Sequence, residues 1–327
     1  MILQWRRKMV YIYLILGFVL LIKGADFFVD GSSSVAKLLK VPAIIIGLTV
    51  VAFGTSMPEA SVSITAALKG ENSLAVSNVL GSNMFNLLVV LGCSALMRPL
   101  SASKSVMKTE FPFSIIITAV LLLVTMKTSV AEVLAGGGEY TLGRVGGILL
   151  LVLFVWFLIA QIKGALKARS EFDGEEYETL SPLKSAVYIT GGIAGIVWGG
   201  NLVVDSATEI ALHFGLSQTF IGLTIVALGT SLPELVTSVV ASRKGENDLA
   251  LGNVIGSNIF NILLILGASA AISPMVVDVN AVYDMFILIV VSILGYLCAK
   301  SKRVLSKKEG ILFLLVYVVY FGYIYVR

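Results

Sequence analysis

Apolar residues form ten long runs along this chain, separated by shorter polar stretches. Each run is close to the about 20 residues that an α-helix needs to cross the hydrocarbon core of a bilayer. The pattern predicts transmembrane helices near residues 9–29, 41–68, 73–97, 110–127, 144–162, 185–205, 216–242, 248–272, 281–299 and 309–326. We therefore expect an all-α integral membrane protein with ten transmembrane helices.

A polar stretch marks the middle of the chain. It runs from Lys163 to Lys184 and is the only long polar stretch between apolar segments. The predicted organisation is an N-terminal repeat of five helices over residues 1–163, a linker over 164–184 and a C-terminal repeat of five helices over 185–327.

The two halves carry the same motif. Residues 47–92 and 222–267 are identical at 28 of 46 aligned positions, at a constant offset of 175. An odd number of helices per repeat forces the two repeats to insert in opposite orientations. Inverted repeats of this kind are typical of secondary transporters, whose substrate site lies near the midplane where the repeats meet.

Positive charges in the loops predict the orientation. Loops after odd-numbered segments hold sixteen Lys and Arg residues, whereas the opposite side holds seven. By the positive-inside rule the linker is cytoplasmic and both termini are extracellular. The expected location is a plasma membrane of the prokaryotic type.

Composition narrows the function. The sequence is 57% hydrophobic and 13% charged, with a mean hydropathy of +0.95, and soluble domains hold roughly 25% charged residues. The net charge of +4 is small and follows the segment ends, so we expect the bilayer and inorganic cations as partners, not nucleic acid. The sequence has no Ser/His or Cys/His pair and no HExxH motif, so we expect neither an enzyme nor a cofactor, and no obligatory protein partner is inferred.

The second predicted helix of each half contains a carboxylate next to a proline. The sequences are GTSMPE at Gly54–Glu59 and GTSLPE at Gly229–Glu234. Pro58 and Pro233 lack an N–H, so each helix is expected to kink and to free a carbonyl oxygen for a cation. The spacing puts Thr55, Glu59 and Ser63 on one face, and Thr230, Glu234 and Ser238 repeat it.

The third predicted helix of each half adds neutral oxygens. Ser82 and Asn86 of GSNMFN are four residues apart, as are Ser257 and Asn261 of GSNIFN. An all-oxygen face suits a hard cation such as Ca²⁺, and Na⁺ can use it too. Glu59 and Glu234 lie deep within predicted spans, and their two negative charges balance one Ca²⁺.

These paired motifs resemble those of the calcium/cation antiporter superfamily, whose sodium/calcium exchangers carry GTS-x-PE followed by GSN in each of two alpha repeats. The resemblance implies alternating access by sliding of helices 1 and 6, and it implies that Glu59 and Glu234 are central Ca²⁺ ligands. It further implies roles for ten other residues: Thr55, Ser56, Thr230 and Ser231 at Na⁺, the carbonyls of Ala52 and Ala227, and the side chains of Ser82, Asn86, Ser257 and Asn261.

One position departs from the family pattern. Many sodium/calcium exchangers have an aspartate where Asn261 stands, and both repeats of this chain carry asparagine. The counter-ion is therefore open between Na⁺ and H⁺, with Glu59 and Glu234 as the proton acceptors in the second case. A cation channel is a weaker alternative, because channels build their filters around a symmetry axis between chains.

Several residues have structural alternatives. Each glutamate is alternatively a structural residue hydrogen-bonded within the bundle. Asn83 and Asn258 are expected to make hydrogen bonds between helices. Lys23 with Asp26 is a candidate gate, although a snorkelling lysine beside an acid near the helix end is favoured.

Overall fold

The computed structural model describes residues 2–126, 140–170, 179–214 and 227–326, and almost all of them are helical. Eight described helices are long and apolar enough to cross a membrane, and a bent pair of helices is a ninth candidate. The eight lie at Met9–Leu39, Asn72–Met97, Val106–Thr125, Arg144–Ser170, Pro182–His213, Asn247–Ile272, Val279–Ser301 and Lys307–Val326. The predicted count of ten is not confirmed, because residues 216–226 of the seventh predicted span lie outside the described residues.

The bent pair is the second predicted span. It consists of α2 (Ala43–Ile46), the π-helical η1 (Gly47–Val51), α3 (Ala52–Thr55) and α4 (Met57–Leu68), and it bends by 53°. Ser56 lies at the break, with φ −83° and ψ 8°, and Pro58 is the second residue of α4, where a missing N–H costs nothing. In the second half α12 (Ala227–Thr230) and α13 (Leu232–Lys244) repeat the break at Ser231.

Two long helices form the centre of the molecule. The first runs through α5 (Asn72–Phe85), the π-helical η2 (Asn86–Val90) and α6 (Leu91–Met97). The second runs through α14 (Asn247–Phe260), η5 (Asn261–Leu266) and α15 (Gly267–Ile272), and is buried along nearly all of its length. The π-helical turns begin at Asn86 and Asn261, and such turns frequently mark functional positions.

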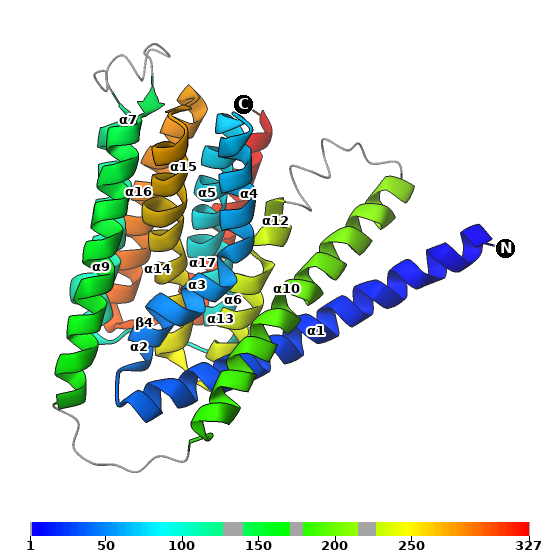
Figure 1. Ribbon diagram of the computed structural model, residues 1–327, viewed down its shortest axis with the longest axis horizontal. Coiled ribbons are helices and arrows are strands. Elements are labelled where there is room, and N and C mark those ends of the chain that lie inside the picture. Colours follow the sequence, from blue (N-terminus) through cyan, green and yellow to red (C-terminus); the bar gives the residue numbers. More distant parts are fainter. Residues whose placement is uncertain (1, 127–139, 171–178, 215–226, 327) are drawn as a thin grey trace.

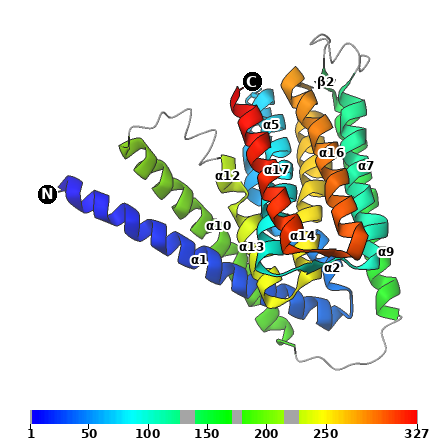
Figure 2. The ribbon, with the colours of Figure 1, turned by 180° about the vertical axis from the view of Figure 1, so that it is seen from behind.

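Five further helical elements surround this centre. In chain order they are η3 (Val106–Glu110), α7 (Phe111–Thr125), α9 (Arg144–Ser170), α16 (Val279–Lys302) and α17 (Lys307–Val326). The view from behind shows α16 and α17 covering the second face of the bundle (Figure 2). Many of their large apolar side chains are exposed, as expected for surfaces that face lipid.

Two short antiparallel ribbons join the halves. β1 (Leu100–Ser101) pairs with β4 (Val304–Leu305), and β2 (Thr141–Leu142) pairs with β3 (Met275–Val276). The starts of β1 and β3, Leu100 and Met275, are related by the repeat offset of 175. The two ribbons lie at opposite ends of the helices (Figures 1 and 2).

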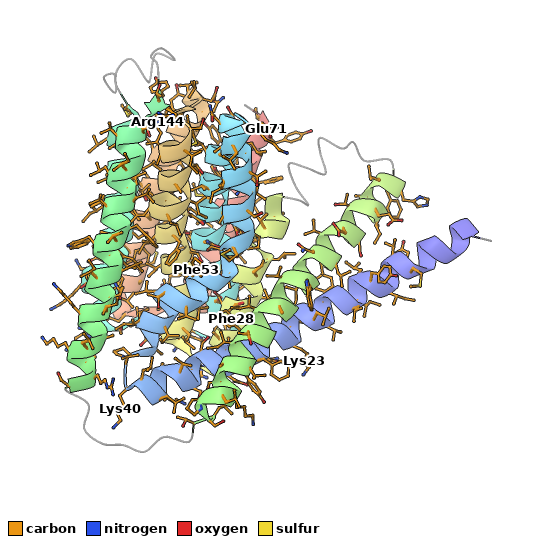
Figure 3. All side chains as sticks on the ribbon, viewed as in Figure 1. Lys23, Phe28, Lys40, Phe53, Glu71 and Arg144 are labelled. Atoms are coloured by element: carbon orange, nitrogen blue, oxygen red, sulfur yellow. The ribbon has the colours of Figure 1, made fainter. Side chains whose placement is uncertain are left out.

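Helices α1 (Ile2–Leu39) and α10 (Pro182–His213) lie outside the bundle and cross it obliquely as a pair (Figure 1). Glycines let the two backbones approach closely, since a Cβ built on Gly24 would lie 2.7 Å from the backbone nitrogen of Ile196. Phe28 is fully buried where this pair meets the bundle (Figure 3), and its ring packs on Gly54. The pair thus contacts the broken helix directly.

Candidate cation-binding site

Two glutamates lie at the centre of the molecule, one from each half of the chain. Glu59 lies in the first turn of α4 and Glu234 in the first turn of α13, and both are inaccessible to solvent. Ser231 Oγ donates a hydrogen bond to Glu59 Oε1, and Ser56 Oγ donates one to Glu234 Oε1, each at 2.9 Å. Because each carboxylate is bound by the serine of the other half, the two halves build one shared site.

The first serine of each GSN motif completes the hydroxyl set. Ser82 Oγ lies 3.5 Å from Glu59 Oε1, and Ser257 Oγ lies 3.4 Å from Glu234 Oε1. The hydroxyl oxygens of Ser231 and Ser82 lie 3.1 Å apart, within hydrogen-bond distance. The serine contacts to the two glutamates all involve Oε1 atoms, and the Oε2 atoms have no hydrogen-bond partner.

Two asparagine amides lie one helical turn beyond these serines. Asn86 and Asn261 are fully buried at the starts of η2 and η5. Each uses its Nδ2 atom in a hydrogen bond to the opposite half: Asn86 donates to Asn258 Oδ1 at 3.1 Å, and Asn261 donates to Asn83 Oδ1 at 2.9 Å. Each amide therefore keeps its own oxygen free.

Four buried oxygens in this cluster accept no hydrogen bond. They are Glu59 Oε2, Glu234 Oε2, Asn86 Oδ1 and Asn261 Oδ1. Buried polar atoms in proteins are nearly always paired, and an unpaired one is costly. A cation that is coordinated by these oxygens removes that cost.

The chemistry of the four oxygens favours a hard cation. Two are carboxylate and two are amide oxygens, the donor types that Ca²⁺ and Na⁺ accept. Among the described residues, no group of three or more His, Cys, Asp or Glu side chains could hold a metal ion. The site therefore offers mixed oxygen ligands with two negative charges.

The remaining predicted ligands are engaged differently. Thr55 Oγ1 donates to Asn253 Oδ1 at 2.9 Å, and Thr230, at the end of α12, is partly buried. The carbonyl of Ala52 accepts the N–H of Ser56 at 3.0 Å within the helix. Ala227 is the first residue of α12. Thr55 Oγ1 also lies 3.4 Å from the carbonyl oxygen of Ala52.

The structure adds two asparagines that the sequence left unassigned. Asn78 Nδ2 donates to Ser63 Oγ, and Asn253 Nδ2 donates to Ser238 Oγ, each at 2.9 Å. These bonds tie each broken helix to the central helix of its own half. Asn78 and Asn253 are related by the repeat offset of 175, and this duplication is the sequence signal that marks them. It does not show that their hydrogen-bond partners are Ser63 and Ser238.

A cavity of about 380 Å³ reaches the breaks of both halves. It is lined by residues of α4, of α10 and of the segment from Gly229 to Pro233, including both kink prolines. α10 leaves the bundle toward its His213 end (Figure 1), so the cavity lies between α10 and the site. The glutamates themselves stay buried beneath it.

Known proteins resemble this chain over nearly its whole length. The profile of the family described as "Sodium/calcium exchanger protein" matches residues 9–163 and 184–326. The chain is 39% identical over 319 residues to the putative antiporter CaxA of Alkalimonas amylolytica, covering 94% of this chain and 96% of CaxA. It is 31% identical over 340 residues to the sodium/calcium exchanger MaX1 of Methanosarcina acetivorans, covering 95% and 97%.

A solved structure also resembles this chain over nearly its whole length. The structure of the sodium-calcium exchanger NCX_Mj soaked with 2.5 mM Na⁺ and 10 mM Sr²⁺ matches with a TM-score of 0.82 and 32% sequence identity, over 96% of this chain and 98% of that chain. The resemblance predicted from the paired motifs is thus confirmed. The chain belongs to the sodium/calcium exchanger family and is a multi-pass membrane protein that performs cation/Ca²⁺ antiport.

Proposed function

We propose that this protein exchanges Ca²⁺ for Na⁺ by alternating access to the site between Glu59 and Glu234. The observation that carries the proposal is the set of four buried, unpartnered oxygens held by matching hydrogen bonds from the two halves. The two carboxylates neutralise one Ca²⁺, and two monovalent cations restore the same balance when Ca²⁺ leaves. A H⁺-coupled exchange on the same carboxylates is the second candidate, since asparagine stands at both Asn86 and Asn261.

We further propose ten transmembrane helices in two inverted repeats of five, with both termini extracellular. The related ribbons at opposite ends of the bundle support the inverted arrangement (Figures 1 and 2). The broken helices support it too, because equivalent breaks at Ser56 and Ser231 meet head to head at one site.

An ionic cluster supports alternating access. At the predicted cytoplasmic side, Asp26 Oδ1 lies 2.9 Å from Arg243 Nη2, and Lys244 Nζ lies 2.7 Å from Asp30 Oδ1. Ser33 Oγ also donates to Glu246 Oε1 at 2.7 Å. These contacts hold α1 against the end of α13. Asp26 therefore pairs with Arg243 and Lys244 of α13. The sequence favoured a snorkelling Lys23 beside Asp26 and kept a gate between the two as the alternative.

On the predicted extracellular side, the repeat equivalent of the Lys244–Asp30 ion pair is not formed. The repeat offset relates Asp30 and Lys244 to Asp205 and Lys69, and these two are exposed and form no ion pair with each other. The cavity beside α10 lies on this open side. We infer an outward-facing conformation, in which closure of the open side pairs Lys69 with Asp205 while the α1 contact separates.

Removing the ionic cluster is expected to shift this equilibrium. Lys244→Met loses contacts to Asp26 and Asp30, and exposed ion pairs contribute about 0–1 kcal/mol each. We expect labelling of a Ser61→Cys probe in the cavity by an impermeant thiol reagent to slow about two- to fivefold. Lys69→Met is the matched control, because its equivalent pair is absent in this conformation. Equal labelling in all three proteins contradicts the proposed role of the cluster.

Proteoliposomes with independently imposed gradients test the counter-ion. We expect Ca²⁺ uptake to follow an outward Na⁺ gradient at fixed pH and to be unaffected by a pH gradient at zero Na⁺. Uptake that responds only to the pH gradient assigns H⁺ as the counter-ion. Currents far above transporter turnover favour a channel instead.

A further inference from the structure

Four asparagines form a closed hydrogen-bonded group where α5 and α14 cross. Asn83 and Asn86 come from the first half, Asn258 and Asn261 from the second, and all four are buried. Asn86 and Asn261 are predicted cation ligands. For Asn83 and Asn258 the sequence predicted hydrogen bonds between helices and no role at the cation.

Backbone carbonyls fix the orientation of the amides. Asn258 Nδ2 donates to the carbonyl of Asn83 at 3.3 Å, and Asn83 Nδ2 donates to the carbonyl of Asn258 at 3.3 Å. A carbonyl oxygen only accepts hydrogen bonds, so the amide atom facing it must be the nitrogen. The side-chain oxygens of Asn83 and Asn258 therefore face the other way.

These two oxygens in turn orient the site amides. Asn83 Oδ1 accepts from Asn261 Nδ2 at 2.9 Å, and Asn258 Oδ1 accepts from Asn86 Nδ2 at 3.1 Å. Both Nδ2 groups are held away from the carboxylates, and the unpartnered atoms of Asn86 and Asn261 are oxygens. If the amide of Asn86 or Asn261 flipped, its N–H₂ group would face the cation and be repelled by it. The flip would also remove one ligand oxygen from the site.

We infer that Asn83 and Asn258 are positioning residues that set Ca²⁺ affinity by fixing the oxygen face of Asn261 and Asn86. This inference rests on the proposed function, because it assumes that the cation binds between the glutamates. Neither residue needs to touch the cation. The two act across the halves, so each positions the ligand of the opposite repeat.

Asn83→Leu tests this role, because leucine has a similar size but no acceptor for Asn261. In proteoliposomes we expect the half-saturating Ca²⁺ concentration to rise about 10- to 100-fold, the range for loss of one interaction with a charged group. The maximal rate should stay within about threefold. The mirrored variant Asn258→Leu should act alike through Asn86.

The matched control uses Asn261→Asp, in which both terminal atoms are oxygens and orientation no longer matters. In that background Asn83→Leu should change the half-saturating concentration by less than about threefold, the range for an uncoupled site. An equal loss in both backgrounds means that Asn83 acts through packing, and an unchanged value in Asn83→Leu alone also overturns the inference. If Asn83→Leu does not fold, Asn83→Ala carries the same comparison. Failure of the wild-type protein to carry Ca²⁺ refutes the proposed function instead.

Discussion

Glu59→Gln is expected to lower Ca²⁺ exchange about 1,000-fold while the protein stays folded. Glutamine has nearly the shape of glutamate and can still accept the hydrogen bond from Ser231, but it removes one of two charges at the ion. A unit charge 4 Å from another contributes about 4 kcal/mol at an effective dielectric constant of 20, or about three powers of ten in affinity. Radioactive Ca²⁺ uptake into proteoliposomes measures this loss. Glu234→Gln should behave alike.

A second measurement separates loss of binding from loss of fold. Ca²⁺ that binds only the folded protein raises its unfolding temperature, so wild-type protein in detergent should gain stability with Ca²⁺ and Glu59→Gln should not. Glu71→Gln is the matched control, since Glu71 is exposed on the turn after α4 (Figure 3) and should keep normal uptake. Wild-type exchange by Glu59→Gln would falsify the assignment of the site.

The pairing of the two buried glutamates was predictable because their motif is duplicated. A carboxylate within an apolar span is costly, and the second copy at the repeat offset indicates that Glu59 and Glu234 form a pair. Burial of both residues, and their hydrogen bonds to the opposite half, agree with this prediction. Sequence spacing located the serines and asparagines of the GSN motifs in the same way.

The contacts across the halves were beyond prediction. Helical spacing shows which residues share a face, but not which helix crosses that face. It grouped Thr55 with Glu59, whereas the break at Ser56 turns the Ser56 hydroxyl toward Glu234. The role of Asn83 toward Asn261 depends on the crossing of α5 and α14, which no local pattern encodes.

Helix lengths show a similar limit. Hydropathy predicted a span over residues 9–29, yet α1 extends from Ile2 to Leu39. Apolar residues mark the part of a helix that contacts lipid or the core, and a helix continues as long as its backbone hydrogen bonds do. The ribbons β1–β4 and β2–β3 were missed because strands of two residues have no pattern of their own.

Gly192→Val is expected to separate α1 from α10 and abolish exchange. A Cβ on Gly192 would lie 2.7 Å from the backbone nitrogen of Phe28 and 2.8 Å from the carbonyl oxygen of Gly24. Backbone atoms cannot rotate aside as a side chain can, so the helices must move apart. Overpacking of this kind costs about 1–3 kcal/mol, and it also displaces Phe28 from Gly54 beside the site.

Gly191→Val is the matched control that tests whether the collision with α1 causes the effect of Gly192→Val. Gly191 precedes Gly192 on the same helix, but a Cβ there would meet no atom within 4 Å, so the same side chain enters the same helix without a collision. We expect Gly191→Val to keep the unfolding temperature and the Ca²⁺ uptake of the wild type, and Gly192→Val to lower both. If the two variants behave alike, close contact between the backbones of α1 and α10 is not what couples this pair to transport. If only Gly192→Val fails, the close contact between the backbones of α1 and α10 is required for transport, because Gly192 lies against Gly24 and Phe28 of α1.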